Sequence, residues 1–546
     1  TPLEETTPLE ETTPLEETTP LEEQPDSEPT GWRRSLRSLP SVRAWRPLSL
    51  LRALRPLLSV RPPAALVVVA LLAGGVGAAD LTKPMPVRRA VVPASLAPVV
   101  GSVAVCPETQ AKGAVSTRVT AGTGGPGQVR VTATTLESAA AEKVMTETGA
   151  RVGRLEVDSE DPVAVVATAT GAQAGGVAVE QVTRAETGPQ HGLASVRCEP
   201  AVSDSWYAGA ATSISDRSDL LLVNPYDDGA IVDVALYSKK GRIDVPGMTG
   251  VSVKARTRVL KPLADWAPDE PWLAVHVLVR SGRVSPAVRR IRSIRGVPSG
   301  SDWIPRTTAP ATTTYVGALP GGSGERTLLI VNPGVDALTA RVTLTQQDSQ
   351  FVPETLGAIE VPGEKVVAVP LTPELDAKST MLRVQTDGPA ALVGAFAEFT
   401  DPAKPGADFL YAAGQLPLTG PALLNDNRIG QTVDTALLFD APDGNAEVTV
   451  TEVTESGSPG RTWIVPVQQG TLVVVALSHA FGRGDPLSVL VTTSSNSAAV
   501  YGSRVTVEKS DRGPLVTELG IQGQPLAGVP VPAVVGDPAG WLVPGH

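Results

Sequence analysis

Apolar and polar residues alternate with a period of two over much of the second half of the chain. The alternation recurs around three similar motifs, DLLLVNP at residues 219–225, TLLIVNP at 327–333 and TALLFD at 435–440. Their corresponding positions Asn224, Asn332 and Asp440 lie 108 residues apart. Period-two alternation broken by Asn-Pro, Asp-Gly and Ser-Gly pairs is typical of half-buried strands joined by tight turns. The pattern therefore predicts three related β-units.

Further strand-like stretches follow each motif. An alternating segment comes directly after it, at residues 230–237, 338–345 and 446–453. Later in each unit two apolar stretches flank a short turn, at residues 273–291, 381–399 and 487–505. We interpret each of these later stretches as a β-hairpin. A weaker copy, VAVVATATGAQAGGVAVEQV at residues 163–182, indicates a fourth unit that has diverged.

The fold class predicted from this pattern is all-β. Roughly six or seven short strands in about 100 residues are what an immunoglobulin-like sandwich needs, so we expect tandem immunoglobulin-like β-sandwiches. The alternative is a propeller with two blades per unit, but a single hairpin signature per unit favours sandwiches. The predicted domains are the diverged unit (103–200), repeat 1 (201–305), repeat 2 (306–415), repeat 3 (416–520) and a C-terminal tail (521–546).

One uninterrupted apolar run, AALVVVALLAGGVGAA at residues 64–79, is long enough to insert into a membrane. We predict a transmembrane signal anchor over residues 62–82 with its N-terminus in the cytoplasm, followed by a stalk at 83–102. The alternative is a secretory signal cleaved near Ala79, because Gly77, Ala78 and Ala79 resemble a small-residue cleavage site. Both interpretations place residues 80–546 outside the cell membrane.

The sequence before this run is segregated by charge. Residues 1–24 are four copies of an acidic, proline-containing hexapeptide, which predicts a disordered segment. Residues 31–61 contain eight arginines and no acid, and the part from Arg33 to Arg61 predicts contact with anionic lipid headgroups. Basic residues beside a span also stay on the cytoplasmic side. Residues 1–61 are therefore expected to be a disordered acidic repeat followed by an arginine-rich juxtamembrane segment.

Composition narrows the possible functions. The net charge is −11, whereas binding to nucleic-acid phosphates requires a basic protein face, so no nucleic-acid partner is expected. The 52 glycines, 50 prolines and only 4% aromatic residues suit many short strands and turns. The two cysteines, Cys106 and Cys198, both follow the apolar run, so an oxidising compartment would favour a disulfide between them. The alternative is two free, buried thiols.

Two groups of residues are candidates for ligand chemistry. Asn224, Pro225 and Asp228 recur as Asn332, Pro333 and Asp336; the pattern predicts a structural turn, and the alternative is a calcium site. Trp206 and Tyr207 are candidates for stacking on sugar rings, although tryptophan in a sandwich more often lies in the core. P-loops, nucleophile elbows and paired metal-binding histidines are absent as sequence motifs. We therefore expect no catalytic residue, no metal, no cofactor and no enzymatic activity.

Three segments resemble a family of actinobacterial membrane-anchored proteins of uncharacterised function. They are GLASVRCEP at residues 192–200, WYAGAA at 206–211 and LLLVNPYDDGAIVDV at 220–234. In that family a W-x-x-G motif precedes an L-x-x-N-P strand and turn, and the resemblance covers residues 60–520. Its members tend to be encoded near an envelope glycosyltransferase, so the resemblance implies a role in cell-envelope biogenesis.

Together these features predict a membrane-anchored, extracytoplasmic β-repeat scaffold or binding protein of the bacterial cell envelope. Its expected partners are membrane lipid, cell-wall glycan or a membrane glycosyltransferase. The first alternative is an accessory subunit of an envelope glycosyltransferase or polysaccharide-assembly system. The second alternative is a cell-wall hydrolase.

Overall fold

The protein is described by a computed structural model. It describes residues 91–92, 95–110, 112, 115–123, 128–136, 142–148, 152–156, 159–172, 174–375, 377–401, 403–404, 406–454, 459–482, 484–524, 528–531 and 534–535. These residues belong to one compact unit, Ala90–Gly536. The acidic repeat, the arginine-rich segment at 33–61 and the predicted membrane anchor at 62–82 lie outside them. No helix within the described ranges is long and apolar enough to cross a membrane.

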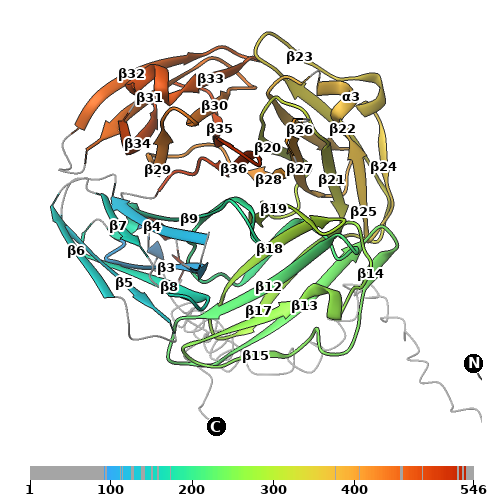
Figure 1. Cartoon of the computed structure of the whole chain (residues 1–546), viewed down its shortest axis with the longest axis horizontal. Coiled ribbons are helices and arrows are strands. Elements are labelled where there is room, and N and C mark those ends of the chain that lie inside the picture. Colours follow the sequence, from blue (N-terminus) through green and yellow to red (C-terminus); the bar gives the residue numbers. More distant parts are fainter. Residues whose placement is uncertain are drawn as a thin grey trace, which may run out of the picture. The chain divides into compact units, whose positions relative to one another are not determined.

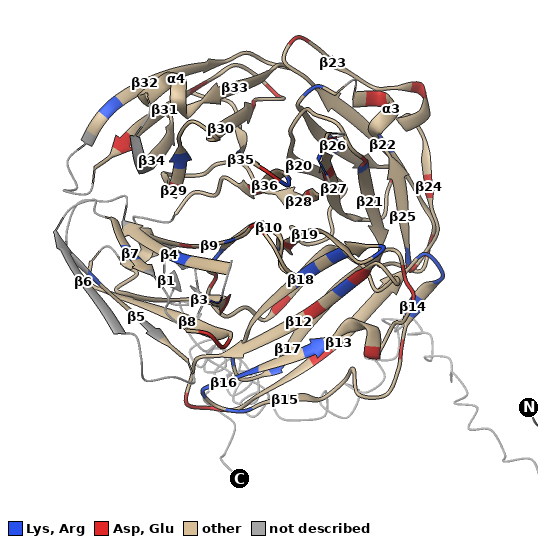
Figure 2. Ribbon diagram, in the orientation of Figure 1, with Lys and Arg blue, Asp and Glu red and all other residues tan. Residues whose placement is uncertain are grey.

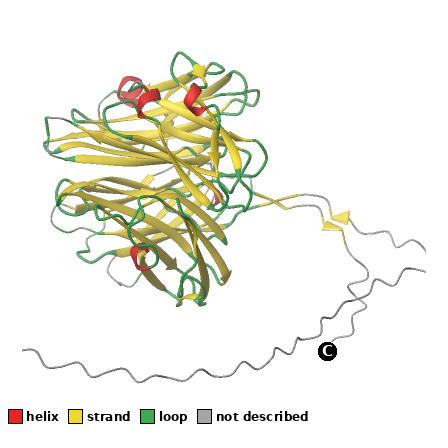
Figure 3. Cartoon of the chain, turned by 90° about the vertical axis from the view of Figure 1, so that its right-hand side faces the viewer, coloured by secondary structure: helices red, strands yellow, loops and turns green. Residues whose placement is uncertain are grey.

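The predicted all-β class is confirmed, because strands build every layer and the helices are short (Figures 1 and 3). The diverged unit contains β3 (Gly101–Thr109), β4 (Val115–Thr123), β5 (Gln128–Thr135), β6 (Glu142–Thr148), β7 (Val152–Glu156), β8 (Val163–Thr170), β9 (Val177–Ala185) and β10 (Gly192–Arg197). Repeat 1 contains β11 (Asp204–Ala210), β12 (Asp216–Asn224), β13 (Ala230–Ser238), β14 (Gly241–Ile243), β15 (Val251–Val253), β16 (Thr257–Pro262), β17 (Leu273–Ser281), β18 (Ser285–Ile294) and β19 (Val297–Ile304).

The other two repeats follow the same order. Repeat 2 contains β20 (Thr313–Leu319), β21 (Arg326–Asn332), β22 (Leu338–Thr345), β23 (Gln350–Phe351), β24 (Ile359–Val361), β25 (Lys365–Pro370), helix α3 (Thr372–Leu375), β26 (Thr380–Thr386), β27 (Leu392–Thr400) and β28 (Ala407–Gln415). Repeat 3 contains β29 (Ala422–Ile429), β30 (Val433–Asp440), β31 (Ala446–Val453), β32 (Pro459–Val467), β33 (Leu472–Ala476), helix α4 (Leu477–Phe481), β34 (Gly484–Thr493), β35 (Tyr501–Ser510) and β36 (Gly513–Gly520).

Each unit contains two sheets. We call the sheet with the first strand of a unit its A sheet and the sheet with the last strand its B sheet. In repeat 1 the A sheet has the order β11-β17-β13-β14, with β15 beside β13, and the B sheet has the order β16-β12-β18-β19. The diverged unit and repeats 2 and 3 repeat this plan. In repeat 2 the pairing of Tyr315 with Gln415 also joins the two sheets.

Two finer predictions are not confirmed by this topology. In an immunoglobulin sandwich the first two strands share a sheet, whereas β11 and β12 lie in different sheets. The hairpin prediction for residues 273–291 is wrong, because β17 pairs with β11 and β13 while β18 pairs with β12 and β19. The two strands exist, but the turn at Gly282 carries the chain from the A sheet to the B sheet. A β-carbon at Gly282 would lie 2.5 Å from the carbonyl oxygen of Gly229, so the crossing needs glycine.

Apolar residues fill the space between the two sheets of each unit and also the space between units. Within repeat 1, Leu222 of β12 and Val275 of β17 belong to one buried cluster. Between repeats 1 and 2, Ala274 of β17 packs in a cluster with Leu329 of β21. Between repeat 3 and the diverged unit, Leu423 of β29 shares a cluster with Ala178 of β9.

The remaining neighbouring sheets share similar clusters, so the eight A and B sheets of the four units pack face to face in a closed cycle (Figure 1). This circular order matches the propeller alternative, with two sheets per unit. It differs from a simple propeller blade because the strands of one sheet are not consecutive in the chain.

The last strands of the four units, β10, β19, β28 and β36, contact one another in the middle of this cycle (Figure 2). They are linked through a buried carboxylate rather than through a strand ladder. Asp408 of β28 accepts hydrogen bonds from the backbone N–H of Leu193 at 3.0 Å and of Val516 at 2.9 Å. Burial raises the pKa of Asp408 well above its usual range, and it does the same for Asp302 of β19.

Buried ion pairs supplement the apolar contacts between the diverged unit and repeat 1. Glu108 of β3 accepts hydrogen bonds from Arg258, at 2.6 Å, and from Arg289. Arg289 also lies 3.8 Å from Asp219 of β12. Figure 2 shows acidic and basic positions side by side on β12 and β18. These contacts fix one unit against the next through charges that no period-two pattern reveals.

The two ends of the unit Ala90–Gly536 pair with each other. β1 (Val91–Val92) is antiparallel to β38 (Val534–Val535), and β2 (Ser95–Ala97) is antiparallel to β37 (Val529–Val531). The predicted stalk at 83–102 and the predicted tail at 521–546 therefore both contribute to two short two-stranded sheets.

Candidate functional site

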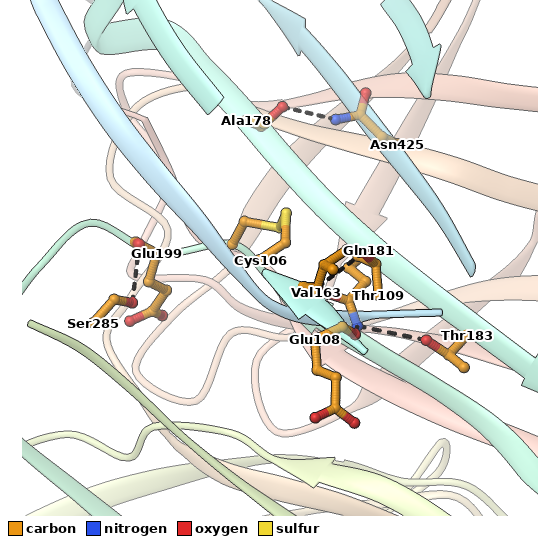
Figure 4. Close-up of a disulfide and its surroundings, with 11 residues drawn as sticks. Cys106, Glu108, Thr109, Val163, Ala178, Gln181, Thr183, Glu199, Ser285 and Asn425 are labelled. Carbon is orange, nitrogen blue, oxygen red and sulfur yellow. Dashed lines mark hydrogen bonds between the residues drawn. A yellow bond between two sulfur atoms is a disulfide. The ribbon is translucent and has the colours of Figure 1, made fainter. Parts of the chain in front are cut away.

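Cys106 and Cys198 form a disulfide with an S–S distance of 2.00 Å (Figure 4). Cys106 lies in the A-sheet strand β3, and Cys198 follows directly after the B-sheet strand β10. Both are buried in the cluster that fills the diverged unit. The backbone N–H of Val105 also donates to the carbonyl oxygen of Glu199 at 2.9 Å. The disulfide therefore holds the chain leaving β10 against the first strand of the diverged unit.

The Asn-Pro motifs lie where β12 and β21 end. The Asn224 amide nitrogen donates to the carbonyl oxygen of Asp228 at 2.7 Å, and its amide oxygen accepts from the N–H of Tyr226 at 3.0 Å. Asn332 makes the same contacts with the carbonyl oxygen of Asp336 and the N–H of Gly334. Pro225 and Pro333 occupy the next position in each turn. The two asparagine side chains therefore organise backbone groups of the turn, which is a structural role.

No group of three or more histidine, cysteine, aspartate or glutamate side chains that would hold a metal ion occurs within the described ranges. In repeat 3, Asp440 occupies the position that Asn224 and Asn332 occupy in repeats 1 and 2. Burial raises the pKa of Asp440 to about 6. The turn of repeat 3 therefore carries a different side chain in a buried setting.

Trp206 and Tyr207 of β11 are both buried, with 7% and 3% of their surface exposed. The Trp206 ring stacks on His276, with ring centroids 3.7 Å apart. The Tyr207 hydroxyl donates to the carbonyl oxygen of Pro286 at 2.8 Å. Both side chains are thus engaged in protein contacts, and each residue also lines a separate cavity.

The larger of these cavities has a volume of about 900 Å³ and is lined by all three repeats. Repeat 1 contributes Asp204 and Trp206, the linker after β19 contributes Arg306 to Ala311, and β20 contributes Thr313 to Tyr315. The end of β28, the linker after it, β35 and the predicted C-terminal tail complete the wall: Gln415, Leu416, Pro417, Thr419, Tyr501, Gln522 and Gly523. We call it the inter-repeat cavity. Its size suits a drug-sized or sugar-sized ligand.

Hydrogen-bonding groups and aromatic rings alternate along its wall. Tyr315 stacks on Tyr501, with ring centroids 3.9 Å apart, across the boundary between repeats 2 and 3. Burial raises the pKa of Tyr501 to about 12, so its hydroxyl stays protonated and can donate. At the repeat 1 side, His276 Nε2 lies 3.0 Å from Asp204 Oδ1. Burial lowers the pKa of His276, although Asp204 acts in the opposite direction.

A smaller pocket of about 60 Å³ adjoins the inter-repeat cavity, and both are lined by Arg306 and Gln522. We call it the arginine pocket. Its wall includes Arg197, Glu199 and Tyr207. Arg306 is paired with Glu199 at 2.7 Å. Glu518 of β36 also lines it, and burial raises the pKa of this carboxyl to about 8.

Sequence reasoning singled out Trp206 and Tyr207 but missed most of this site. Arg306, Gln415 and Gln522 lie at or beside the predicted boundaries at 305/306, 415/416 and 520/521. Linker residues show no period-two alternation of apolar and polar side chains, so no pattern in the sequence marked them as part of a site. The boundaries themselves were the available signal, because the cavity wall includes residues that follow the last strands β19, β28 and β36 of the three repeats.

Comparison with known proteins identifies one family. A model described as a family of unknown function (DUF5719) matches residues 154–478, which is more than half of the chain. The matched region includes repeats 1 and 2 and most of the cavity wall. A search among curated proteins finds no match.

Proposed function

The chain belongs to the DUF5719 family of unknown function, and on this premise we propose that it is a binding protein whose ligand occupies the inter-repeat cavity. One observation carries the proposal: about 900 Å³ of space is lined by polar and aromatic side chains from three different repeats. Cavities of this size with a few convergent polar groups are the usual form of a ligand site. Closure of the cycle places those groups together, so the fold and the site depend on each other.

We further propose that the protein works as a membrane-anchored, extracytoplasmic component of the bacterial cell envelope. The apolar run at residues 64–79 supports the anchor, and the disulfide between Cys106 and Cys198 supports an oxidising compartment. Cell-wall glycan is the proposed ligand, because saccharides combine hydroxyl groups with apolar ring faces, as this wall does. The role is one of binding and presentation without catalysis.

Retention on glycan tests the binding role. Full-length protein in detergent is incubated with purified cell-wall glycan, and the retained fraction is measured. Thr313→Trp places a bulky side chain at an exposed position in the cavity wall and is expected to reduce retention at least tenfold. Thr462→Trp, at an exposed position of β32 outside the wall, is the matched control and should retain normally. Equal retention of both variants, or none of the wild type, would contradict the proposal.

A second proposed role is that of an accessory subunit of an envelope glycosyltransferase. The arginine-rich segment from Arg33 to Arg61, beside the apolar run, supports it because such a segment is available for contacts at the cytoplasmic face. Deletion of residues 1–61 is expected to abolish association with the transferase while leaving glycan retention unchanged. Undiminished association of the deleted form in native membranes would exclude this role.

A further inference from the structure

Arg197 is half-buried and differs from the buried arginines near the middle of the cycle, because none of the described carboxylates forms an ion pair with it. Arg504 pairs with Glu180 at 2.7 Å, and Arg290 pairs with Asp216 at 2.7 Å. Within the described part of the chain, Arg197 Nη1 is buried without a hydrogen-bond partner. Its Nη2 has one long contact, 3.4 Å to the carbonyl oxygen of Gly520. Burial lowers the pKa of this guanidinium.

An unpaired buried charge is costly, and the cost is relieved when an opposite charge comes within hydrogen-bond distance. Arg197 lines the arginine pocket, where such a group has room to bind. The pocket measures about 60 Å³, which is space for roughly four to six water-sized groups. A carboxylate with its attached carbon or a phosphate group has that size. Guanidinium groups also match the planar and tetrahedral oxygens of these anions by paired hydrogen bonds.

The other charged groups of the pocket leave it favourable to an anion. Arg306 brings a second guanidinium, and its charge is balanced by Glu199 at 2.7 Å. Glu518 brings a carboxyl group, but its raised pKa of about 8 keeps most of it protonated at neutral pH. Glu180 and Glu199 attract the Arg197 guanidinium from a distance and so oppose the effect of burial on its pKa. Arg197 is therefore the charged group of the pocket that has no ion pair with a described carboxylate.

We propose that Arg197, with Arg306 beside it, binds an anionic group, a carboxylate or a phosphate, of a ligand whose remaining part lies in the inter-repeat cavity. This inference rests on the proposed binding function and names the charge that its ligand carries. The two spaces share Arg306 and Gln522 and so lie next to each other, and the proposal has one ligand occupy both. The anion becomes the partner of Arg197, and the uncharged part of the ligand contacts the hydroxyl, amide and aromatic groups of the larger wall.

Full-length protein in detergent is titrated with inorganic phosphate, with D-glucuronate and, as an uncharged comparison, with D-glucose. Binding is followed through the melting temperature and through tryptophan fluorescence, since Trp303 lines the pocket. Phosphate or glucuronate should raise the melting temperature, and glucose should not. Binding of phosphate alone identifies a phosphate group, and binding of glucuronate alone identifies a sugar carboxylate. No shift with either anion would overturn the proposal.

Arg197→Gln removes the charge and keeps a polar side chain. The anion affinity is expected to fall at least tenfold, while the melting temperature without ligand stays equal or rises because the guanidinium with its buried, unpartnered Nη1 is gone. Arg242→Gln is the matched control, since Arg242 pairs with exposed Asp244 at 3.3 Å and lies outside the pocket. Unchanged anion affinity of Arg197→Gln, or a large loss of stability without ligand, would overturn the proposal.

The outcome is separable from that of the proposed function. Anion binding that depends on Arg197, without any retention on cell-wall glycan, would contradict the envelope-glycan role alone. Glycan retention that is the same for the wild type and Arg197→Gln would contradict the anion site alone.

Discussion

At the scale of single residues, Glu518 links burial to pH. Its carboxyl lies in the middle of the cycle, and a β-carbon at Gly317 would lie 2.6 Å from its Oε1 atom. Burial raises its pKa from 4.5 to about 8, although Ser503 and Arg504 act in the opposite direction. Between these two pH values the folded protein keeps a proton that the unfolded chain releases. The stability from this group is therefore full below about pH 4.5 and is lost as the pH rises towards 8.

Glu518→Gln should remove this part of the pH dependence, because glutamine imitates the protonated acid. The difference in free energy of unfolding, variant minus wild type, is expected to grow between pH 5 and pH 8 by up to about 1.4 kcal/mol per pH unit. Thermal unfolding at several pH values measures it. Glu360→Gln, at an exposed position of β24, is the control for the chemical change itself. A constant difference for Glu518→Gln would show that this carboxyl does not titrate in that range.

At the scale of elements, Gly209 of β11 leaves room for the ring of Tyr411, which projects from β28. A β-carbon at Gly209 would lie 2.4 Å from a ring carbon of Tyr411, and the Tyr411 hydroxyl donates to the Gly209 carbonyl oxygen at 2.8 Å. The W-x-x-G motif that begins at Trp206 thus has a physical reason. Gly209→Ala should cost about 1–3 kcal/mol through overpacking, in addition to backbone strain at its φ of 131°.

Gly241 is the matched control for this prediction, because its φ is 138° and nothing lies within 4 Å of the place that a β-carbon would occupy. Gly241→Ala should therefore show the strain without the clash and lose less stability. Denaturant unfolding of both variants compares the two costs. Equal losses would mean that Tyr411 moves aside and that the close approach of its ring to Gly209 is not required.

Alternation predicted where strands lie but not which sheet they join. The stretches at 230–237, 338–345 and 446–453 correspond to β13, β22 and β31. The hairpin predictions failed because period-two alternation indicates that a strand has an inner and an outer face. It does not indicate which strand pairs with it. Arg197 and Arg306 could not be recognised as site residues either. In a sequence, an arginine beside a strand end is interpreted as an ordinary solvated residue, and only the folded chain places these two in a pocket wall.

At the scale of the whole unit, closure distinguishes this protein from an open repeat array. In an open array each repeat contacts only its neighbours, and removing a terminal repeat exposes one surface. Here repeat 3 packs against repeat 2 through Ala318, Met381 and Leu438, and against the diverged unit through Leu423 and Ala178. It also supplies β36 to the central strands. Removing it exposes two apolar surfaces at once and deletes part of the middle.

A chain ending at residue 415 is therefore expected to lose cooperative unfolding and to aggregate, although three of the four units remain. Size-exclusion chromatography and calorimetry measure both effects. A chain ending at residue 524 is the control: it keeps the eight sheets of the four units and lacks only β37 and β38, so it should elute as the wild type does and unfold in one transition near the wild-type temperature. A monomeric three-unit chain with a transition at the wild-type temperature would show that the units fold independently. The inter-repeat cavity would then need repeat 3 only as a wall, and not for the integrity of the units around it.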